Sequence, residues 1–270
     1  MRVFVYDQSF EGLLSVIFDA YTLKCFPSHL CGRGDLHYFA GAHVVATRPE
    51  KSGRVFAALC RKLSTEGLHN LFLLWLAEES GGDLLLFRHL CKVLQHGGIA
   101  ENDPADADAL AVRRLARKVA RQAEHYAGFV RFQKTRPGFV RSGSDGVIAK
   151  ELYLAIIEPQ HNILPLLQRH FVARLGDQLW AIYDAARHYG LMAEGEDVRE
   201  IFLDENILHH GGLREELLAE GEEFMQEMWK SYFQSCAVRE RVNPSLQKQL
   251  MPQRYWKYLT EKQIFRAFQL

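Results

Sequence analysis

The spacing of apolar residues changes once along this chain, and the change limits the folds open to it. From residue 9 to about residue 126, apolar side chains recur with the 3.6-residue period of amphipathic helices, beginning with Phe10, Leu13, Leu14 and Ile17. From 129 to 193 the period falls to two, which is typical of strands with one buried face. A helical part followed by a part made of strands predicts an α+β fold.

The alternating part predicts four strands, at 129–133, 152–157, 179–183 and 188–192. A short helix is expected at 163–174, between the second strand and the third. The order strand–strand–helix–strand–strand predicts a small, mainly antiparallel sheet with a helix on one face.

Outside this part we expect a strand at 2–6, a long helix at about 213–235 and short helices near the carboxyl terminus. We predict a single α+β domain over 1–270. Within it, 1–126 is a helical part, 127–193 the small sheet and 194–270 a helical C-terminal part.

The composition excludes several classes of protein. Hydrophobic residues make up 48% and charged residues 24%, with 33 basic and 33 acidic side chains, which argues against a disordered or coiled-coil chain. No apolar run reaches the roughly 18–20 residues of a membrane span. Five scattered cysteines without a CxxC pair indicate a reducing compartment. We therefore expect a cytoplasmic protein that does not bind a membrane.

No pattern in the sequence calls for a metal or a cofactor. Cys25, Cys31, His37 and His43 recur every six residues, at the loose edge of zinc-ligand spacing, and the cysteines are more typical of a loop around Pro27. The signatures of dinucleotide-binding, P-loop, metalloprotease and serine-hydrolase sites do not occur. The sequence therefore predicts no cofactor and no metal, and it leaves open whether the protein is an enzyme.

A basic ridge marks the predicted helix at about 106–126. Arg113, Arg117 and Arg121 repeat at i, i+4 and i+8, with Arg114 and Lys118 alongside. Like charges at this spacing cost a few tenths of a kcal/mol per pair, so the ridge is easier to explain with an anionic partner. The alternative is a solvated face whose charges pair with acidic residues from elsewhere in the fold.

Two shorter segments carry candidate side chains. In the predicted strand 129–133, alternation places Arg131 and Gln133 beside Phe129 on one face, where they could contact bases or phosphates; the alternative is the outer face of a one-sided sheet. After the strand 152–157, Glu158 and His161 could form an acid–base pair, with Asp184 as a third candidate. They could equally be loop and capping residues.

The carboxyl-terminal segment combines basic and aromatic residues, a combination that could hold a phosphate backbone and stack on bases. Its candidate residues are Arg239, Arg241, Arg254, Tyr255 and Lys257. Helical spacing predicts that Trp256 faces the core and that Tyr255 lies on the surface. The alternative is that the aromatics form core and that the arginines pair with the acidic segment 194–227.

Several motifs spread over the chain occur together: Tyr6-Asp7-x-Ser9-Phe10-Glu11-Gly12, Gly128-Phe-Val-Arg-Phe132, Ile157-Glu-Pro159, Leu164-Pro165, His170-Phe171 and Asn243-Pro-x-Leu-x-x-Gln-x-Met-Pro-x-Arg-Tyr-Trp-x-Tyr-Leu-Thr-Glu261. In these motifs the chain resembles a bacterial family of DNA-repair (DNA-metabolism) proteins whose defining domain has no assigned function. Members of that family tend to be encoded beside a radical-SAM protein presumed to act on DNA, and some are fused to a uracil-DNA-glycosylase domain. The resemblance implies a DNA context and no particular reaction.

Three functions follow as hypotheses. The first is a DNA-binding accessory protein in DNA repair or modification that positions a damaged or single-stranded site for a radical-SAM partner. The chain lacks the CxxxCxxC cysteines of the radical enzyme itself. The second is an enzyme acting on a nucleobase or nucleotide through Glu158, His161 or Asp184. The third is a protein-interaction scaffold that docks through the acidic segment 194–227.

Overall fold

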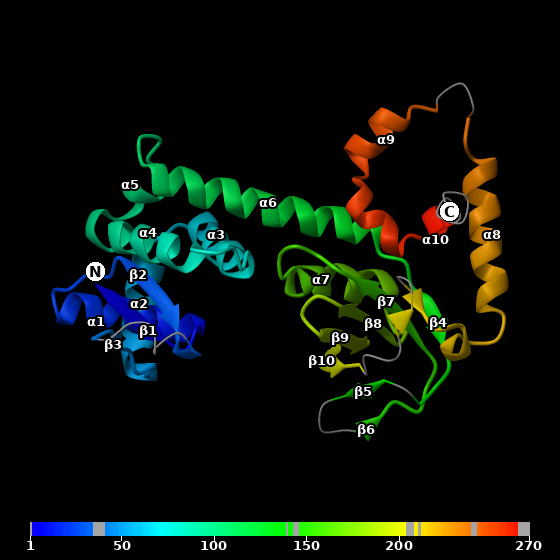
Figure 1. Ribbon diagram of the computed structural model, residues 1–270, viewed down its shortest axis with the longest axis horizontal. Coiled ribbons are helices and arrows are strands. Elements are labelled where there is room, and N and C mark those ends of the chain that lie inside the picture. Colours follow the sequence, from blue (N-terminus) through cyan, green and yellow to red (C-terminus); the bar gives the residue numbers. More distant parts are fainter. Residues whose placement is uncertain are drawn as a thin grey trace. The chain divides into compact units, whose positions relative to one another are not determined.

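The computed structural model describes residues 2–34, 41–138, 140–142, 146–203, 208–209, 212–238 and 242–263 (Figure 1). The chain forms two compact units, Met1–Arg121 and Gln122–Leu270, and helix α6 (Ala107–Phe129) passes from the first into the second. The predicted α+β class is confirmed, and the single domain over 1–270 stays a prediction.

The first unit combines a short parallel sheet with a group of helices. Strand β1 (Val3–Tyr6) pairs in parallel with β2 (His29–Gly32) and β3 (His43–Val44). Its helices besides α6 are α1 (Phe10–Thr22), α2 (Pro49–Lys62), α3 (Thr65–Leu76), α4 (Gly82–His96) and α5 (Gly98–Glu101). The part predicted to be helical thus contains a sheet, of which the sequence predicted the first strand and missed the other two.

The beginning of α1 shows how local chemistry sets an element boundary. Ser9 has extended backbone angles, and its hydroxyl accepts a hydrogen bond from the Gly12 amide at 2.9 Å, as an N-cap does. Asp7 accepts hydrogen bonds from the amide and hydroxyl of Ser9 and from the hydroxyl of Thr47. A Cβ at position 12 would lie 2.1 Å from Asp7 Oδ1, so only glycine fits. The Tyr6–Gly12 motif therefore closes the turn between β1 and α1.

In the described part of the second unit, seven strands form one sheet in the order β4-β7-β8-β9-β10-β5-β6. They are β4 (Gln133–Thr135), β5 (Arg141–Ser142), β6 (Gly146–Val147), β7 (Leu152–Ile157), β8 (Trp180–Asp184), β9 (Tyr189–Glu194) and β10 (Asp197–Phe202). A separate hairpin joins β11 (Leu208–His209) and β12 (Gly212–Leu213).

Helices and 3₁₀ turns complete this unit. Helix α7 (Leu164–Leu175) connects β7 to β8, and the 3₁₀ helix η3 (Glu215–Leu217) precedes α8 (Glu222–Ser235). The C-terminal segment comprises α9 (Pro244–Leu250), the 3₁₀ helix η5 (Gln253–Tyr258) and α10 (Thr260–Gln263). The expected long helix at 213–235 therefore begins only at residue 222.

The central strands bury both faces. Leu152, Leu154 and Ile156 of β7 point into one core, whereas Phe171 of α7 packs against Trp180 on the opposite side, with ring centroids 5.9 Å apart. Such two-sided burial suits parallel pairing, and β7 and β8 are parallel, with Ile157 opposite Asp184. The sheet is mainly antiparallel, as expected, and this pair is the exception among its described pairs, because a helix that connects neighbouring strands brings the chain back in the same direction.

The expected strand at 129–133 is wrong as well. Helix α6 continues to Phe129, the amide of Val130 still donates to the Tyr126 carbonyl at 3.0 Å, and β4 begins only at Gln133. Tyr126 and Phe129 pack against the ring of Tyr255, at centroid distances of 4.9 and 5.3 Å. This tertiary contact holds the helix beyond the point where the local alternation suggests a strand.

Candidate nucleic-acid interface

A row of cations lies on the exposed side of α6. Arg114, Arg117, Lys118 and Arg121 are exposed and recur at i, i+3, i+4 and i+7, the spacing of one helix face. We call these four residues the basic face of α6. The buried side consists of Ala109, Val112, Leu115, Ala116 and Val119. The sequence predicted the ridge but centred it on Arg113 instead of on Arg114 and Lys118.

Arg113 is turned further toward the interior than the sequence predicted. Its side chain lines a cavity of about 10 Å³ together with His89 and Glu101. Its Nε is buried and has no hydrogen-bond partner among the described residues. Helical geometry explains the difference, because Arg113 lies four residues after the buried Ala109 and three before the buried Ala116, and so shares their side of the helix.

The basic face forms no ion pair with the part of the chain that the structure describes. Among the described residues, no carboxylate lies within the 4.0 Å of an ion pair from Arg113, Arg114, Arg117, Lys118 or Arg121. Arg117 Nε instead donates to the Arg113 carbonyl at 3.2 Å. The exposed charge is therefore available to an anion, and a solvated face stays the alternative.

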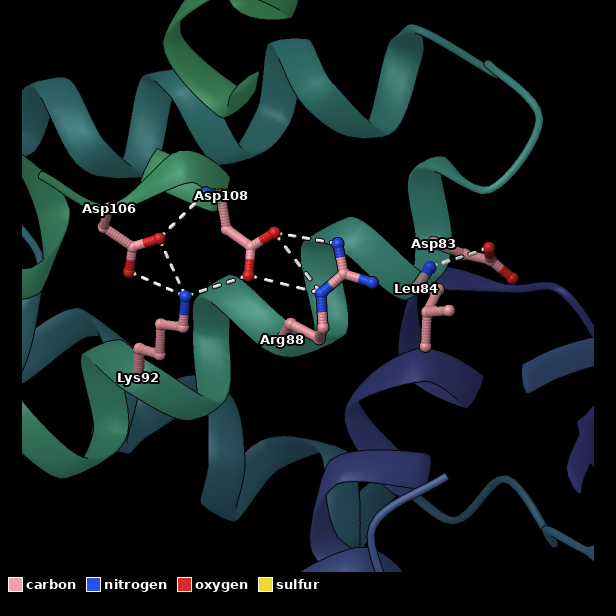
Figure 2. Close-up of polar contacts among 6 residues, drawn as sticks. All are labelled: Asp83, Leu84, Arg88, Lys92, Asp106 and Asp108. Carbon is pink, nitrogen blue, oxygen red and sulfur yellow. Dashed lines mark hydrogen bonds and ion pairs between the residues drawn. The ribbon is translucent and has the colours of Figure 1, made fainter. Parts of the chain in front are cut away.

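At the amino-terminal end of α6, in contrast, the acidic side chains Asp106 and Asp108 form ion pairs with cations of α4. Figure 2 shows Arg88 and Lys92 of α4 reaching Asp108, which they contact at 2.8 and 2.9 Å, while Lys92 also contacts Asp106 at 2.7 Å. The hydrogen bond from Arg88 is the main reason why the pKa of Asp108 falls to about 2. This network fixes the start of α6 on α4, so the basic face begins on an anchored helix.

The three acid–base candidates lie at one end of the parallel pair in the second unit. Glu158 and His161 follow the last residue of β7, and Asp184 is the last residue of β8. Ligands of sheets with parallel strands commonly bind beyond the carboxyl ends of those strands. The parallel pairing thus brings together residues whose proximity the sequence alone did not establish.

Asp184 is committed to a structural contact. Its side chain is fully buried, and it accepts hydrogen bonds from the Arg187 guanidinium at 2.9 Å and from the backbone amides of Ala186 and Arg187. Burial raises its pKa, against the lowering effect of these hydrogen bonds. Arg187 in turn donates to the carbonyls of Pro159 and Gln160. Asp184 therefore ties the turn after β8 to the loop after β7.

Glu158 is held as a carboxylate by the C-terminal segment. Lys257 Nζ forms an ion pair with Glu158 Oε2, and the Tyr258 hydroxyl donates to the same oxygen at 2.9 Å. The hydrogen bond from Lys257 is the main cause of the lowered pKa of Glu158. A partly exposed carboxylate of this kind could act as a base but not as an acid near neutral pH. His161 is half-buried, and its amide donates to Gln122 Oε1 at 2.9 Å.

The expected orientation of Tyr255 and Trp256 is wrong. Tyr255 is buried, with 3% of its surface exposed, whereas Trp256 is half-buried and donates from Nε1 to the Met251 carbonyl at 3.0 Å. The segment is a 3₁₀ helix, in which each residue turns the chain by about 120° instead of 100°. Tyr255 thus fills the space between His125 and Phe129, and cannot stack on a base without leaving it.

Arg254 remains the exposed cation of this segment. Its guanidinium lies 5.1 Å from the Tyr255 ring centroid and donates to Gln160 Oε1 and to the Tyr255 hydroxyl, each at 3.3 Å. A stacked guanidinium of this kind is held in place before a ligand arrives. Lys257, in contrast, shares its charge with Glu158.

The remaining candidates divide into two groups. Arg131 binds Glu261, with Nη2 and Oε1 2.7 Å apart, and Gln133 Oε1 lies 3.4 Å from the Leu213 amide, so both serve contacts inside the unit. Burial alone would raise the pKa of Glu261, but hydrogen bonds from Arg131 and Trp229 hold it below its usual value. Arg239 and Arg241 lie outside the described residues, as does His37.

The described structure thus combines an α+β fold with a basic helix face, on a helix whose start is held by ion pairs. A family model described as a domain of unknown function, DUF4130, matches residues 81–261, a range that contains α6 and the whole C-terminal motif. The chain belongs to this family. Searches of curated proteins and of solved structures found no match.

In the described part of the chain, no helix is both long enough and apolar enough to span a membrane.

Proposed function

We propose that the protein is a cytoplasmic, DNA-binding accessory protein of bacterial DNA repair or modification, which holds single-stranded or damaged DNA for a radical-SAM partner. The observation that carries the proposal is the basic face of α6, which forms no ion pair with the described residues. Four cations on one helix face match the phosphates of a nucleic-acid backbone, which supply most of the affinity in such complexes. Arg254, stacked on Tyr255, is a separate exposed cation of the second unit.

The radical-SAM partner is supported by the resemblance of the C-terminal motif to the DNA-repair family. The chain has no cysteine triplet for an iron–sulfur cluster, so a radical reaction would take place on another protein. In this proposal the chain supplies affinity for DNA and the partner supplies the chemistry.

The DNA part is tested by fluorescence anisotropy with labelled single-stranded and duplex oligonucleotides at several salt concentrations. The logarithm of the affinity should fall linearly with the logarithm of the salt concentration, with a slope of about −0.7 to −0.9 per phosphate contact. Arg117→Gln and Arg121→Gln should each weaken binding to all sequences alike and reduce the slope by about one unit. Arg169→Gln and Arg174→Gln, exposed on α7, are the matched controls and should have little effect.

Two outcomes would contradict the DNA proposal. One is the absence of binding at about 50–100 mM salt, and the other is binding whose affinity does not depend on salt. The partner is tested separately, by co-purification of the full chain with a radical-SAM protein from the same organism, with and without damaged DNA. Failure to co-purify under both conditions would remove the partner from the proposal and leave DNA binding unaffected.

A further inference from the structure

Helix α8 presents an apolar surface that the described parts of the chain leave uncovered. None of its fourteen residues is buried. Phe224, Met225, Met228 and Tyr232 have exposed fractions of 67%, 59%, 51% and 60%. Phe224, Met228 and Tyr232 repeat at i, i+4 and i+8 and so form one stripe, with Met225 at its side. We call these four residues the apolar face of α8.

The contacts of α8 lie on its other side. Figure 1 shows α8 beside α10, and the Lys262 ammonium of that helix lies 5.2 Å from the ring centroid of Phe233. Trp229, at the margin of the apolar face, donates from Nε1 to Glu261 at 3.0 Å. These contacts fix which side of α8 faces the unit, and they leave the apolar face turned toward solvent.

An exposed apolar face adds little to the stability of a helix unless another surface packs against it. Isolated helices shorter than about 12–15 residues are marginal in water, and protein helices owe most of their stability to the packing of an apolar face. Single exposed apolar residues are common on protein surfaces, but a contiguous patch of aromatic and methionine side chains is typical of a binding surface. Methionine suits this role because its flexible side chain adapts to different partners.

The charges around α8 indicate what kind of partner fits. Residues 214–230 contain two basic side chains, Arg214 and Lys230, and six acidic ones, Glu215, Glu216, Glu220, Glu222, Glu223 and Glu227. Glu216 and Glu227 pair with Arg214 and Lys230. Among the described residues, Glu220 and Glu223 form no ion pair. The apolar face thus lies beside excess negative charge.

We propose that the apolar face of α8 binds an amphipathic helix of a partner protein, one that carries Lys or Arg beside its own apolar residues. The apolar residues supply the contact area, and the glutamates select a basic partner and repel an acidic one. A second copy of this chain fits less well, because it would bring the same excess of negative charge to the interface. The inference goes beyond the basic face of α6 and stands whether or not that face binds DNA.

The test uses the full chain and two synthetic amphipathic peptides that share one leucine-rich face. The first peptide has Lys at the positions that flank this face, and the second has Glu at the same positions. Fluorescence anisotropy of the labelled peptides should show that the Lys peptide binds at least about ten-fold more tightly than the Glu peptide, which corresponds to about 1.4 kcal/mol.

Substitutions then locate the site. Met228→Glu should weaken the Lys peptide at least about ten-fold, an effect of about 1.4 kcal/mol. Leu250→Glu, at an equally exposed apolar position on α9, is the matched control and should leave binding unchanged. The double variant Glu220→Lys/Glu223→Lys should reverse the preference in favour of the Glu peptide. Circular dichroism of each variant checks that the helices remain folded.

Three results would overturn the proposal. The first is that neither peptide binds, and the second is that both bind equally well. The third is that the Lys peptide binds the Met228→Glu variant as well as the wild-type chain. Sedimentation of the wild-type chain supplies a further criterion. A dimer that Met228→Glu converts into a monomer would assign the apolar face to a second copy instead of a basic partner helix.

Discussion

The hydroxyl of Tyr255 lies 3.2 Å from Nδ1 of His125, and this contact joins residues 130 positions apart in the chain. The two rings meet edge to face, with centroids 5.7 Å apart, and Phe129 lies 5.3 Å from Tyr255 on the same helix end. The C-terminal motif therefore closes on the carboxyl-terminal end of α6. Its central aromatic residue is part of the core that holds this closure.

Tyr255→Ala should destabilise the protein because it removes a buried aromatic ring. Truncation of a buried aromatic side chain typically costs about 3–5 kcal/mol. Tyr255→Phe keeps the ring and loses only the hydroxyl contacts, so it should cost about 0.5–1.5 kcal/mol. Urea unfolding followed by circular dichroism measures both values. A loss below about 1 kcal/mol for Tyr255→Ala would place the ring outside the core and return it to the list of stacking residues.

The sequence predicted elements well where the local pattern and the tertiary packing agree. Strand β7 has the predicted bounds, and α7 and β9 each begin one residue after the predicted start. Their apolar residues lie where the sheet and α7 pack against each other, so the sequence pattern and the observed burial agree. The short strands β2 and β3 were missed because four and two residues are too few to carry a period.

The candidate site was harder to predict because distant residues decide it. The i, i+4 spacing located the basic ridge but not the inward turn of Arg113, which depends on the burial of Ala109 and Ala116 on the same side of the helix. Glu158 looked like an acid–base candidate, and only the fold reveals Lys257 and Tyr258 against it. The exposed face could have been predicted from one pattern in the sequence, the i, i+3, i+4 and i+7 spacing of Arg114, Arg117, Lys118 and Arg121.

Arg131→Met should destabilise the second unit strongly, because it leaves the Glu261 carboxylate buried without its cation. Glu261 has a side chain 1% exposed, and the loss of one partner of a buried ion pair typically costs about 3–5 kcal/mol. The double variant Arg131→Met/Glu261→Met should recover most of that loss, since it removes the uncompensated charge. Urea unfolding of the two single variants and the double variant completes the cycle. Additive losses in the double variant would show that the two side chains act independently.

Asp108 should make the stability of the first unit depend on pH in the acid range. Its pKa in the folded protein is about 2, below the roughly 3.9 of an unfolded chain, so its contribution is present above about pH 4. It should be lost as the pH falls from about 4 to about 2, and it amounts to about 1–2 kcal/mol because Arg88 and Lys92 are partly exposed.

The measurement compares the wild-type chain with Asp108→Asn by urea unfolding at neutral pH and near pH 2. The stability difference between the two proteins should be largest at neutral pH and should nearly vanish at the acid end. Asp177→Asn, at an exposed position away from these ion pairs, is the control and should show no such convergence. An Asp108→Asn difference that stays constant across the range would mean that the ion pairs of Figure 2 contribute nothing measurable.

Two glycine-to-alanine substitutions in helices of the first unit should have effects of opposite sign. Alanine is favoured over glycine inside a helix by about 1 kcal/mol, so Gly53→Ala in α2, where an added Cβ meets no atom within 4 Å, should stabilise the protein by roughly that amount.

At Gly67 in α3 the added Cβ would lie 2.5 Å from Glu101 Cδ. Glu101 cannot move away freely, because it accepts hydrogen bonds from the amide and hydroxyl of Ser64, the N-cap of the same helix. Overpacking of this kind costs about 1–3 kcal/mol and should exceed the gain in helix propensity, so Gly67→Ala should lower the midpoint of thermal unfolding while Gly53→Ala raises it. Equal stabilisation by the two substitutions would show that the Ser64–Glu101 contact yields without cost.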